Sequence, residues 1–242
     1  MGGIYYIKRK TNLSNYQCHG FTTSLNLPQT SHSNYLSNES KQDANGNING
    51  KKWTSYNALP EFYISMYNGA YGFDAGILCS GNNTFRWFIF GTNGIIYGSS
   101  LSVNPGTSVI LSADVLGAAN KIRFSIKQGN NFLVNGEYSI PASVYNALRL
   151  GAEVHRCIVI AANENAEQDP GKGTACEFSY TSMYTGLMVL TNGSTTSMIS
   201  TVETVKTDYG DGKPWGIPKN GVFNQDYYYS AGSVDVAWAI YG

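Results

Sequence analysis

Charge is the first property that this chain has little of. Only 13% of its 242 residues are charged, and 16 Lys and Arg balance 16 Asp and Glu, so the formal net charge is zero. Globular proteins usually carry roughly 25% charged residues. A chain without a basic excess does not attract phosphate backbones, so we expect no nucleic-acid partner. Asn, Ser, Thr, Gly and the 18 tyrosines must therefore supply the polar surface.

Long hydrophobic runs are also missing. No stretch of about 18 apolar residues occurs, so we expect no membrane-spanning helix. No signal peptide is recognisable. Met1-Gly2-Gly3 is either a start placed before a mature secreted chain or the natural start of a cytosolic one, and we favour the first. Low charge with abundant Tyr, Asn, Ser and Thr is common in extracellular and glycan-binding proteins, so we predict a secreted or extracytoplasmic bacterial protein.

Cysteine is scarce, and its spacing excludes the common metal motifs. Cys18, Cys79, Cys157 and Cys176 form no C-x-x-C pair, so we expect no zinc site, no other metal and no cofactor. Four cysteines permit three disulfide pairings. Cys157–Cys176 is one candidate, if the segments on either side of the polar loop 163–174 pair as a hairpin. The alternative is four buried thiols that pack as small apolar side chains.

Helical periodicity is nearly absent, because only Pro141–Leu150 spaces its apolar residues as a helix does. The rest reads as some twelve short strands with turn signals every 8–15 residues, from Gly3–Lys10 to Ser233–Tyr241. Among them, Thr174–Tyr180 and Leu187–Leu190 are predicted as separate strands. This pattern predicts an all-β fold of two packed antiparallel sheets, a concanavalin A-like or jelly-roll sandwich. We expect one domain over residues 1–242, with a polar loop or insertion at about 29–52.

The densest apolar segment is Leu59–Tyr97, which predicts an antiparallel meander. Three turn-like breaks, at Asn68-Gly69, at 80–83 and at 92–94, contain residues that tolerate a positive φ. They separate four predicted strands: Glu61–Tyr67, Phe73–Cys79, Thr84–Gly91 and Ile95–Tyr97. The third strand has apolar or aromatic residues on both faces. It is either covered on both sides, or one face is a ligand-binding surface lined with rings.

A binding surface is predicted on the face that the alternation assigns to Tyr63 and Tyr67. Arg86 joins this face if the turn at 80–83 has the right parity, which the sequence does not decide. Trp215, between Pro214 and Gly216, is either an exposed ring for sugar stacking or a ring folded over a sheet edge. We therefore take Tyr63, Tyr67, Arg86 and Trp215 as candidate ligand contacts.

Catalytic motifs are harder to find. Glycosidases use two carboxylates across a cleft, but no E-x-D-x-E triplet occurs. If the chain is an enzyme, its acid and base come from strand carboxylates that could meet across neighbouring strands, and otherwise these are surface acids. His155 is two residues from Glu153 and shares its face, as a proton-relay or metal pair would. The candidate carboxylates are Glu61, Asp74, Glu153 and Glu177.

A family resemblance rests on Gly2-Gly3, FTTSLNLP, the stretch YGFDAGILCSGNNTFRWFIF and the NPGTSVIL turn and strand. In this order the segments resemble the YrpD-like family of small secreted bacterial proteins. The resemblance covers roughly residues 2–135, and more loosely residues up to Ser182. It implies secretion and a concanavalin-like sandwich, and it assigns no catalytic residue.

The arrangement is also distantly similar to the glutamic peptidases, which share that sandwich. Their catalytic pair is a Gln and a Glu, and Glu177 in TACEFSY is the position that the resemblance suggests for the Glu. Glu61 stands nearest to the expected Gln, and no strand glutamine is present. The resemblance therefore implies the fold and not the activity.

We predict from these observations a non-catalytic recognition module for a glycan or another cell-surface ligand. The alternatives are a polysaccharide- or peptide-cleaving hydrolase with paired carboxylates, and a self-assembling structural, inclusion or toxin component.

Overall fold

The computed structural model describes residues 2–11, 18–32, 47–48, 51–52, 58–81, 83–91, 94–117, 120–162, 176–197, 203–208, 223–228 and 234–240. Side chains are described within 18–29, 61–79, 83–91, 98–117, 120–157 and 181–197. The predicted loop at 163–174 and most of the polar segment at 29–52 lie outside the described residues. A Gly, Pro and Asp-rich loop is predicted from Thr207 to Gly221, but Thr207 and Asp208 belong to a strand and the rest of that loop also lies outside the described residues.

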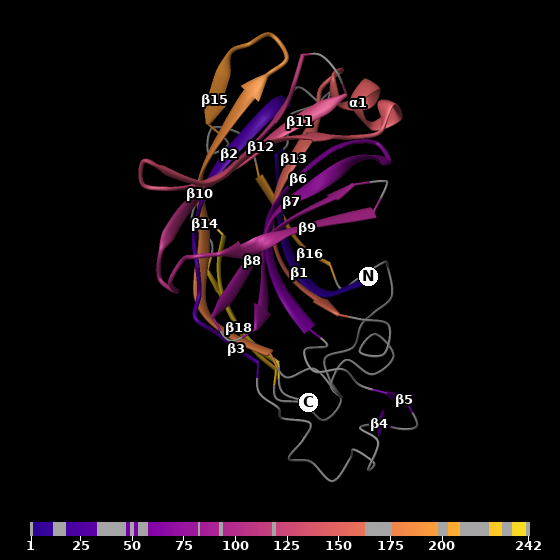
Figure 1. Cartoon of the computed structure of the whole chain (residues 1–242). Helices are drawn as coiled ribbons and strands as arrows, with labels where there is room; N and C mark the ends of the chain where they lie inside the picture. Colours follow the sequence, from indigo (N-terminus) through magenta and orange to yellow (C-terminus); the bar gives the residue numbers. More distant parts are fainter. Residues whose placement is uncertain are drawn as a thin grey trace.

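One sheet has seven antiparallel strands and contains the predicted meander as β6 to β9 (Figure 1). Its order across the sheet is β16 (Glu203–Asp208), β1 (Gly2–Thr11), β13 (Glu153–Ala162), β6 (Ala58–Asn68), β7 (Tyr71–Gly81), β8 (Thr84–Gly91) and β9 (Gly94–Leu101). The four meander strands are sequential neighbours joined by short turns, as the sequence predicts.

The second sheet has nine strands. Seven follow one path: β12 (Asn131–Ser139), β11 (Lys121–Gln128), β10 (Ser108–Val115), β2 (Cys18–Asn26), β14 (Cys176–Leu190), β18 (Val234–Ile240) and β17 (Phe223–Tyr228). Two short strands pair with β14 beside this path, β3 (Thr30–His32) and β15 (Thr195–Ser197). A separate pair joins β4 (Asn47–Ile48) to β5 (Lys51–Lys52).

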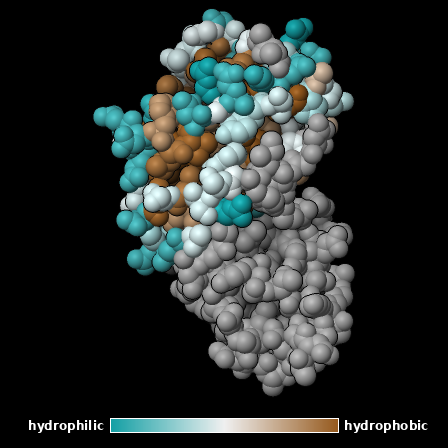
Figure 2. Space-filling view, viewed as in Figure 1, coloured by the Kyte–Doolittle hydropathy of each residue, from teal (hydrophilic) through white to brown (hydrophobic). Residues whose placement is uncertain are grey.

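The core lies between the two sheets, because alternate residues of the facing strands are apolar and buried. One hydrophobic cluster combines Phe62, Ile64 and Met66 of β6 with Phe21 and Leu25 of β2 and Ile122, Phe124 and Ile126 of β11. The all-β sandwich is thus confirmed. In Figure 2, hydrophobic residues gather within the coloured upper part of the view, and hydrophilic residues lie around them.

The single helix among the described residues, α1 (Ala142–Leu148), packs against β6 and β7 and buries Val144 and Leu148. The predicted helix is confirmed, with both i, i+4 residues in the core. Asn68, at the end of β6, donates two hydrogen bonds to the carbonyls of Ala147 and Gly151, at 3.1 and 2.9 Å. Both carbonyls lie at the C-terminal end of the helix, where Ala147 also accepts from Leu150 N, so Asn68 fixes the helix end to the meander. No helix in the described part of the chain could span a membrane.

Two sequence-based expectations are wrong. We expected separate strands at Thr174–Tyr180 and Leu187–Leu190, but β14 is one strand that absorbs irregularities near Tyr180 and Thr185. Thr185 has a φ of 49°, so a local bulge and not a turn interrupts the pattern. The candidate hairpin for a Cys157–Cys176 disulfide does not form either, because β13 and β14 belong to different sheets. Cys18, Cys79 and Cys157 are buried thiols.

Candidate functional site

The pairing register gathers polar and aromatic side chains on the outer face of the seven-stranded sheet, away from the core. Ser65 of β6 lies between His155 of β13 and Asp74 of β7, and Tyr63 lies between Cys157 and Gly76. Glu153 pairs with Tyr67 one row further along. We call this surface the tyrosine face, and its members are Glu61, Tyr63, Ser65, Tyr67, Asp74, Phe88, Glu153, His155 and Cys157.

Asp74 is the most connected acid of the tyrosine face. Ser65 Oγ donates to its Oδ1 at 2.5 Å, and the Tyr67 hydroxyl donates to its Oδ2 at 3.3 Å. Two hydroxyl donors favour the ionised carboxylate. Burial and the charge of Asp74 raise the pKa of Tyr67 above its ordinary range, so Tyr67 stays a donor at any physiological pH. Asp74 is thus positioned as a carboxylate base or as a hydrogen-bond acceptor for a ligand.

Glu61, on the same face, has a carboxyl group that favours its protonated form. Burial, and next the negative charge of Asp74, raise the pKa of Glu61 to about 8. At neutral pH its carboxyl group therefore carries a proton. A carboxyl that keeps its proton and a second carboxyl on the same face are the groups that acid–base hydrolysis uses, and a raised carboxyl pKa can mark a functional site.

A second pair of polar residues lies on β13. His155 Nε2 and Glu153 Oε1 are 2.5 Å apart, so the predicted shared face is correct. The histidine ring is buried, and the next residue of this face, Cys157, places its sulfur 3.6 Å from Ser65 Oγ. Through Ser65, the residues of β13 therefore connect to Asp74. Among the described residues, no three His, Cys, Asp or Glu side chains come together as metal ligands would.

Two positions of β7, Gly72 and Gly76, have no room for a side chain beside the tyrosines of β6. A Cβ at Gly72 would lie 2.4 Å from the Tyr67 ring, and a Cβ at Gly76 would lie 2.5 Å from Tyr63. The Tyr67 ring therefore lies over Gly72, and the Cα and Cβ of Tyr63 lie against Gly76, on either side of Asp74 in the strand. The buried ring of Phe88 meets Tyr63 edge to face, with 5.8 Å between centroids, and fixes its orientation. Rings thus stand beside hydrogen-bonding groups on one sheet surface.

Arg86 has a structural task. The β8–β9 pairing shifts between Arg86 and Phe88, which is a β-bulge. The guanidinium donates from Nε and from its second terminal nitrogen to the Gly98 carbonyl, at 3.1 and 2.9 Å. It therefore satisfies a carbonyl in the bulge. The turn parity aligns Arg86 with Leu78 and Glu61, on the side of the sheet that its predicted role requires.

The other predicted residues are scattered. Glu177 belongs to β14 in the nine-stranded sheet, so its strand is not beside those of Glu61, Asp74 and Glu153. Trp215 lies outside the described residues. The sequence-based analysis missed Ser65 and Cys157, because their value comes only from strands that are far apart in the sequence. The i, i+2 pattern of Glu153, His155 and Cys157 was the available signal.

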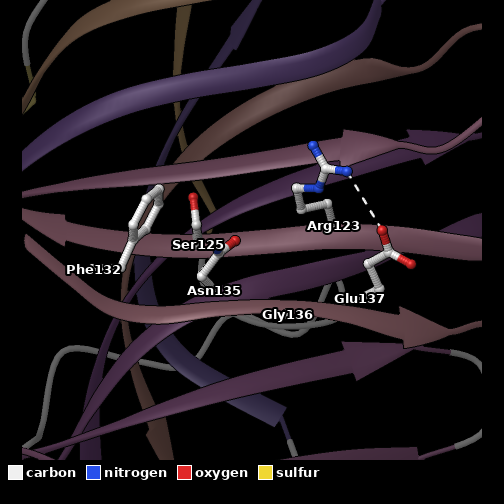
Figure 3. A pocket seen from close by; sticks show the side chains of 6 residues that line it. All are labelled: Arg123, Ser125, Phe132, Asn135, Gly136 and Glu137. Carbon is white, nitrogen blue, oxygen red and sulfur yellow. Dashed lines mark hydrogen bonds and ion pairs between the residues drawn. The ribbon is translucent and has the colours of Figure 1, made fainter.

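A pocket of about 410 Å³ lies on the outer face of the nine-stranded sheet, at its β12 edge. In Figure 3, Ser125 and Asn135 lie side by side, between Phe132 and the Arg123–Glu137 pair. We call this pocket the edge pocket, and its lining is Arg123, Ser125, Phe132, Asn135, Gly136 and Glu137. The outward direction of Arg123 and Ser125 follows from the alternation in Lys121–Lys127, but their partners on β12 depend on the register of the hairpin.

Comparisons with known proteins add little to the fold. No family model matches the chain and no curated protein matches its sequence, so the YrpD-like resemblance has no support from them. Sheep galectin-11 in complex with glycerol aligns over 64% of this chain and 92% of its own, with 12% identity and a TM-score of 0.29. Laminarinase from Flavobacterium sp. UMI-01 aligns over 65% and 66%, with 8% identity and a TM-score of 0.32. Both are concanavalin-like sandwiches, and we draw no functional argument from likenesses this weak.

Proposed function

We propose that the protein recognises a carbohydrate on its tyrosine face and works outside the cytoplasm. The observation that carries this proposal is the placement of Tyr63 and Tyr67 on the same sheet face as the hydrogen-bonded carboxyl of Asp74, with the Tyr67 ring over Gly72. Rings stack on the apolar faces of sugars, while a few fixed polar groups orient the hydroxyls. The low charge of the chain, 13%, also suits a ligand that is bound without ion pairs.

The contacts differ from those that the sequence suggests. Arg86 already donates to Gly98, and Ser65 is buried and donates to Asp74, so we assign the polar contact to the partly exposed Asp74. Tyr63 is fixed by Phe88 and Tyr67 by Asp74. Because both rings are held before a ligand arrives, little side-chain entropy is lost on binding.

A glycan array with matched variants tests this proposal. Asp74→Asn and Tyr67→Phe change one polar atom each and should weaken binding to the glycans that wild type selects, by about tenfold for each lost hydrogen bond. Asn146→Ala, at an exposed position of α1, removes a polar group elsewhere and should leave the array unchanged. An array that is blank for wild type, or that Asp74→Asn leaves unaltered, contradicts the proposal.

A second candidate function is hydrolysis of a glycosidic bond by the same face. The observation that favours it is the pair of carboxyls with opposite tendencies, Glu61 with a pKa of about 8 and Asp74 beside two donors. The register places their Cα atoms two side-chain rows apart, roughly 13 Å along the strands. Both carboxyls lie on one face of the sheet, as the acid and the base of a glycosidase must. Glu61 would protonate the leaving oxygen, and Asp74 would take the proton of the attacking water.

The release of reducing ends from a panel of plant and bacterial polysaccharides tests this candidate. Glu61→Gln and Asp74→Asn should each abolish release, whereas Asn146→Ala should not affect it. If wild type releases no reducing ends from any polysaccharide that it binds, recognition alone remains.

A further inference from the structure

The edge pocket is a second candidate site, separate from the tyrosine face. It lies on β11 and β12 of the nine-stranded sheet, whereas the tyrosine face belongs to β13, β6, β7 and β8 of the other sheet. Each sheet turns its inner face to the shared core, so the two outer faces point away from each other. A ligand in the pocket therefore does not compete with a ligand on the tyrosine face.

The register explains why these side chains meet. Arg123 pairs directly with Glu137, and Ser125 pairs with Asn135. Phe124 and Gly136 pair between these two rows and face the core, so the residues on either side of them, which are polar, face outward. Cross-strand pairs of this kind place their Cβ atoms about 5 Å apart. The hairpin therefore builds two adjacent rows of hydrogen-bonding groups on one surface.

The polar groups of the pocket retain capacity for a ligand. Arg123 donates to Glu137 over 3.4 Å, a long contact between two exposed side chains. A guanidinium has five N–H donors, a carboxylate accepts at several positions, and the Asn135 amide both donates and accepts. Sugar hydroxyls also donate and accept, so this mixed set matches vicinal hydroxyls.

An aromatic wall completes the pocket. Phe132 lines it with 51% of its surface exposed, so its ring is accessible to a ligand. The Lys127 ammonium lies 4.2 Å from the centroid of the ring and holds it in place. A fixed ring beside a mixed set of donors and acceptors is the combination that binds a sugar ring.

The charge balance selects among sugars. Glu137 lies 3.4 Å from Arg123 and 3.5 Å from Lys121, and the Lys127 ammonium lies over Phe132. Asp114 pairs with Arg123 from the other side, and its carboxyl group lies over Gly20 in the next strand. Three cations and two carboxyl groups therefore lie around the pocket, and their charges nearly cancel. Because neither sign dominates strongly, we expect an uncharged ligand to fit the site best.

We propose that the edge pocket binds a neutral sugar residue, which gives the protein two carbohydrate sites on opposite faces. Phe132 would stack on the sugar ring, and Asn135, Ser125 and the Arg123–Glu137 pair would hydrogen-bond its hydroxyls. Two sites that point apart let one molecule bridge two glycan chains, and such bridging increases avidity without a new contact.

NMR chemical-shift mapping of the full chain tests this inference. The probes are the methyl glycosides of glucose, galactose, mannose and N-acetylglucosamine, with methyl glucuronide as the charged comparison. We expect at least one neutral probe to shift the amide resonances of Ser125, Asn135 and Gly136. Asn135→Ala should weaken that probe by about tenfold, as the loss of one or two hydrogen bonds predicts.

Two variants separate this site from the proposed function. Phe132→Ala changes an exposed side chain, so the fold should survive, and it should abolish the shifts in the pocket. Tyr67→Phe should leave them unchanged, because Tyr67 belongs to the other sheet. The inference is overturned if no neutral probe shifts the pocket resonances, or if methyl glucuronide binds there more tightly than every neutral probe. Loss of the pocket shifts in Tyr67→Phe would also overturn it.

Discussion

The substitution Glu61→Gln should stabilise the folded protein at pH 8. Glu61 has a pKa of about 8 in the folded state against an ordinary value of 4.5, because burial and the Asp74 charge disfavour its ionised form. Below pH 4.5 both states are protonated, and the carboxyl has no effect on the pH dependence. Between pH 4.5 and 8 the unfolded state releases its proton and the folded state keeps it, so wild-type stability falls as the pH rises.

The magnitude follows from the same shift. A difference of about 3.5 pH units at about 1.4 kcal/mol per unit corresponds to roughly 5 kcal/mol, and residual solvent screening of a half-buried carboxyl reduces it to ~3–5 kcal/mol. Glutamine resembles the protonated carboxyl and does not ionise, so the variant avoids this loss. Urea unfolding of both proteins from pH 4 to pH 8 measures it. The unfolding free energies of wild type and variant should agree at pH 4, and the variant should become the more stable of the two as the pH rises to 8. A constant difference across that range would refute the reasoning.

Three further substitutions or reactions test the scaffold around the sites. Gly98→Ala should lower the free energy of unfolding in urea by about 1–3 kcal/mol, because the new Cβ would lie 1.7 Å from the Trp87 indole. The control is Gly117→Ala, which has open space around it and should change that free energy by less than about 0.5 kcal/mol. Asn68→Ala removes the donor of two helix-end carbonyls and should cost about 1–3 kcal/mol by thermal or urea unfolding; an unchanged midpoint would show that other donors replace it. Burial raises the pKa of the Cys18 thiol to about 12, so peptide mapping should find Cys18 unmodified by an alkylating reagent at pH 8 until urea unfolds the chain, and rapid labelling of the folded protein would contradict that burial.

The fold was predictable because its signals are local. The alternation in Glu61–Tyr67 and Lys121–Lys127 identifies two strands without any knowledge of their neighbours. Turn residues such as Asn68-Gly69, where Gly69 has a φ of 60°, separate the strands of the meander. The long strand β14 was predicted as two pieces, because a single bulge at Thr185 interrupts the alternation as a turn would.

The sites were less predictable, because they depend on pairing between distant segments. Ser65 meets Asp74 through the β6–β7 hairpin, which the sequence indicates, but it meets His155 and Cys157 through β13, which is about 90 residues away. No periodicity records that register. The role of Arg86 was not predictable either. The side of the sheet on which it lies depends on the turn parity, and its hydrogen bond to the Gly98 carbonyl depends on a bulge in β9.

The central claim is that the tyrosine face holds the carbohydrate. A crystal structure of the full chain with the oligosaccharide that wild type prefers on a glycan array tests it most directly. The account predicts a sugar ring against Tyr63 or Tyr67, with a hydroxyl within hydrogen-bond distance of Asp74. A ligand bound only at the edge pocket, or at any other surface, would contradict it.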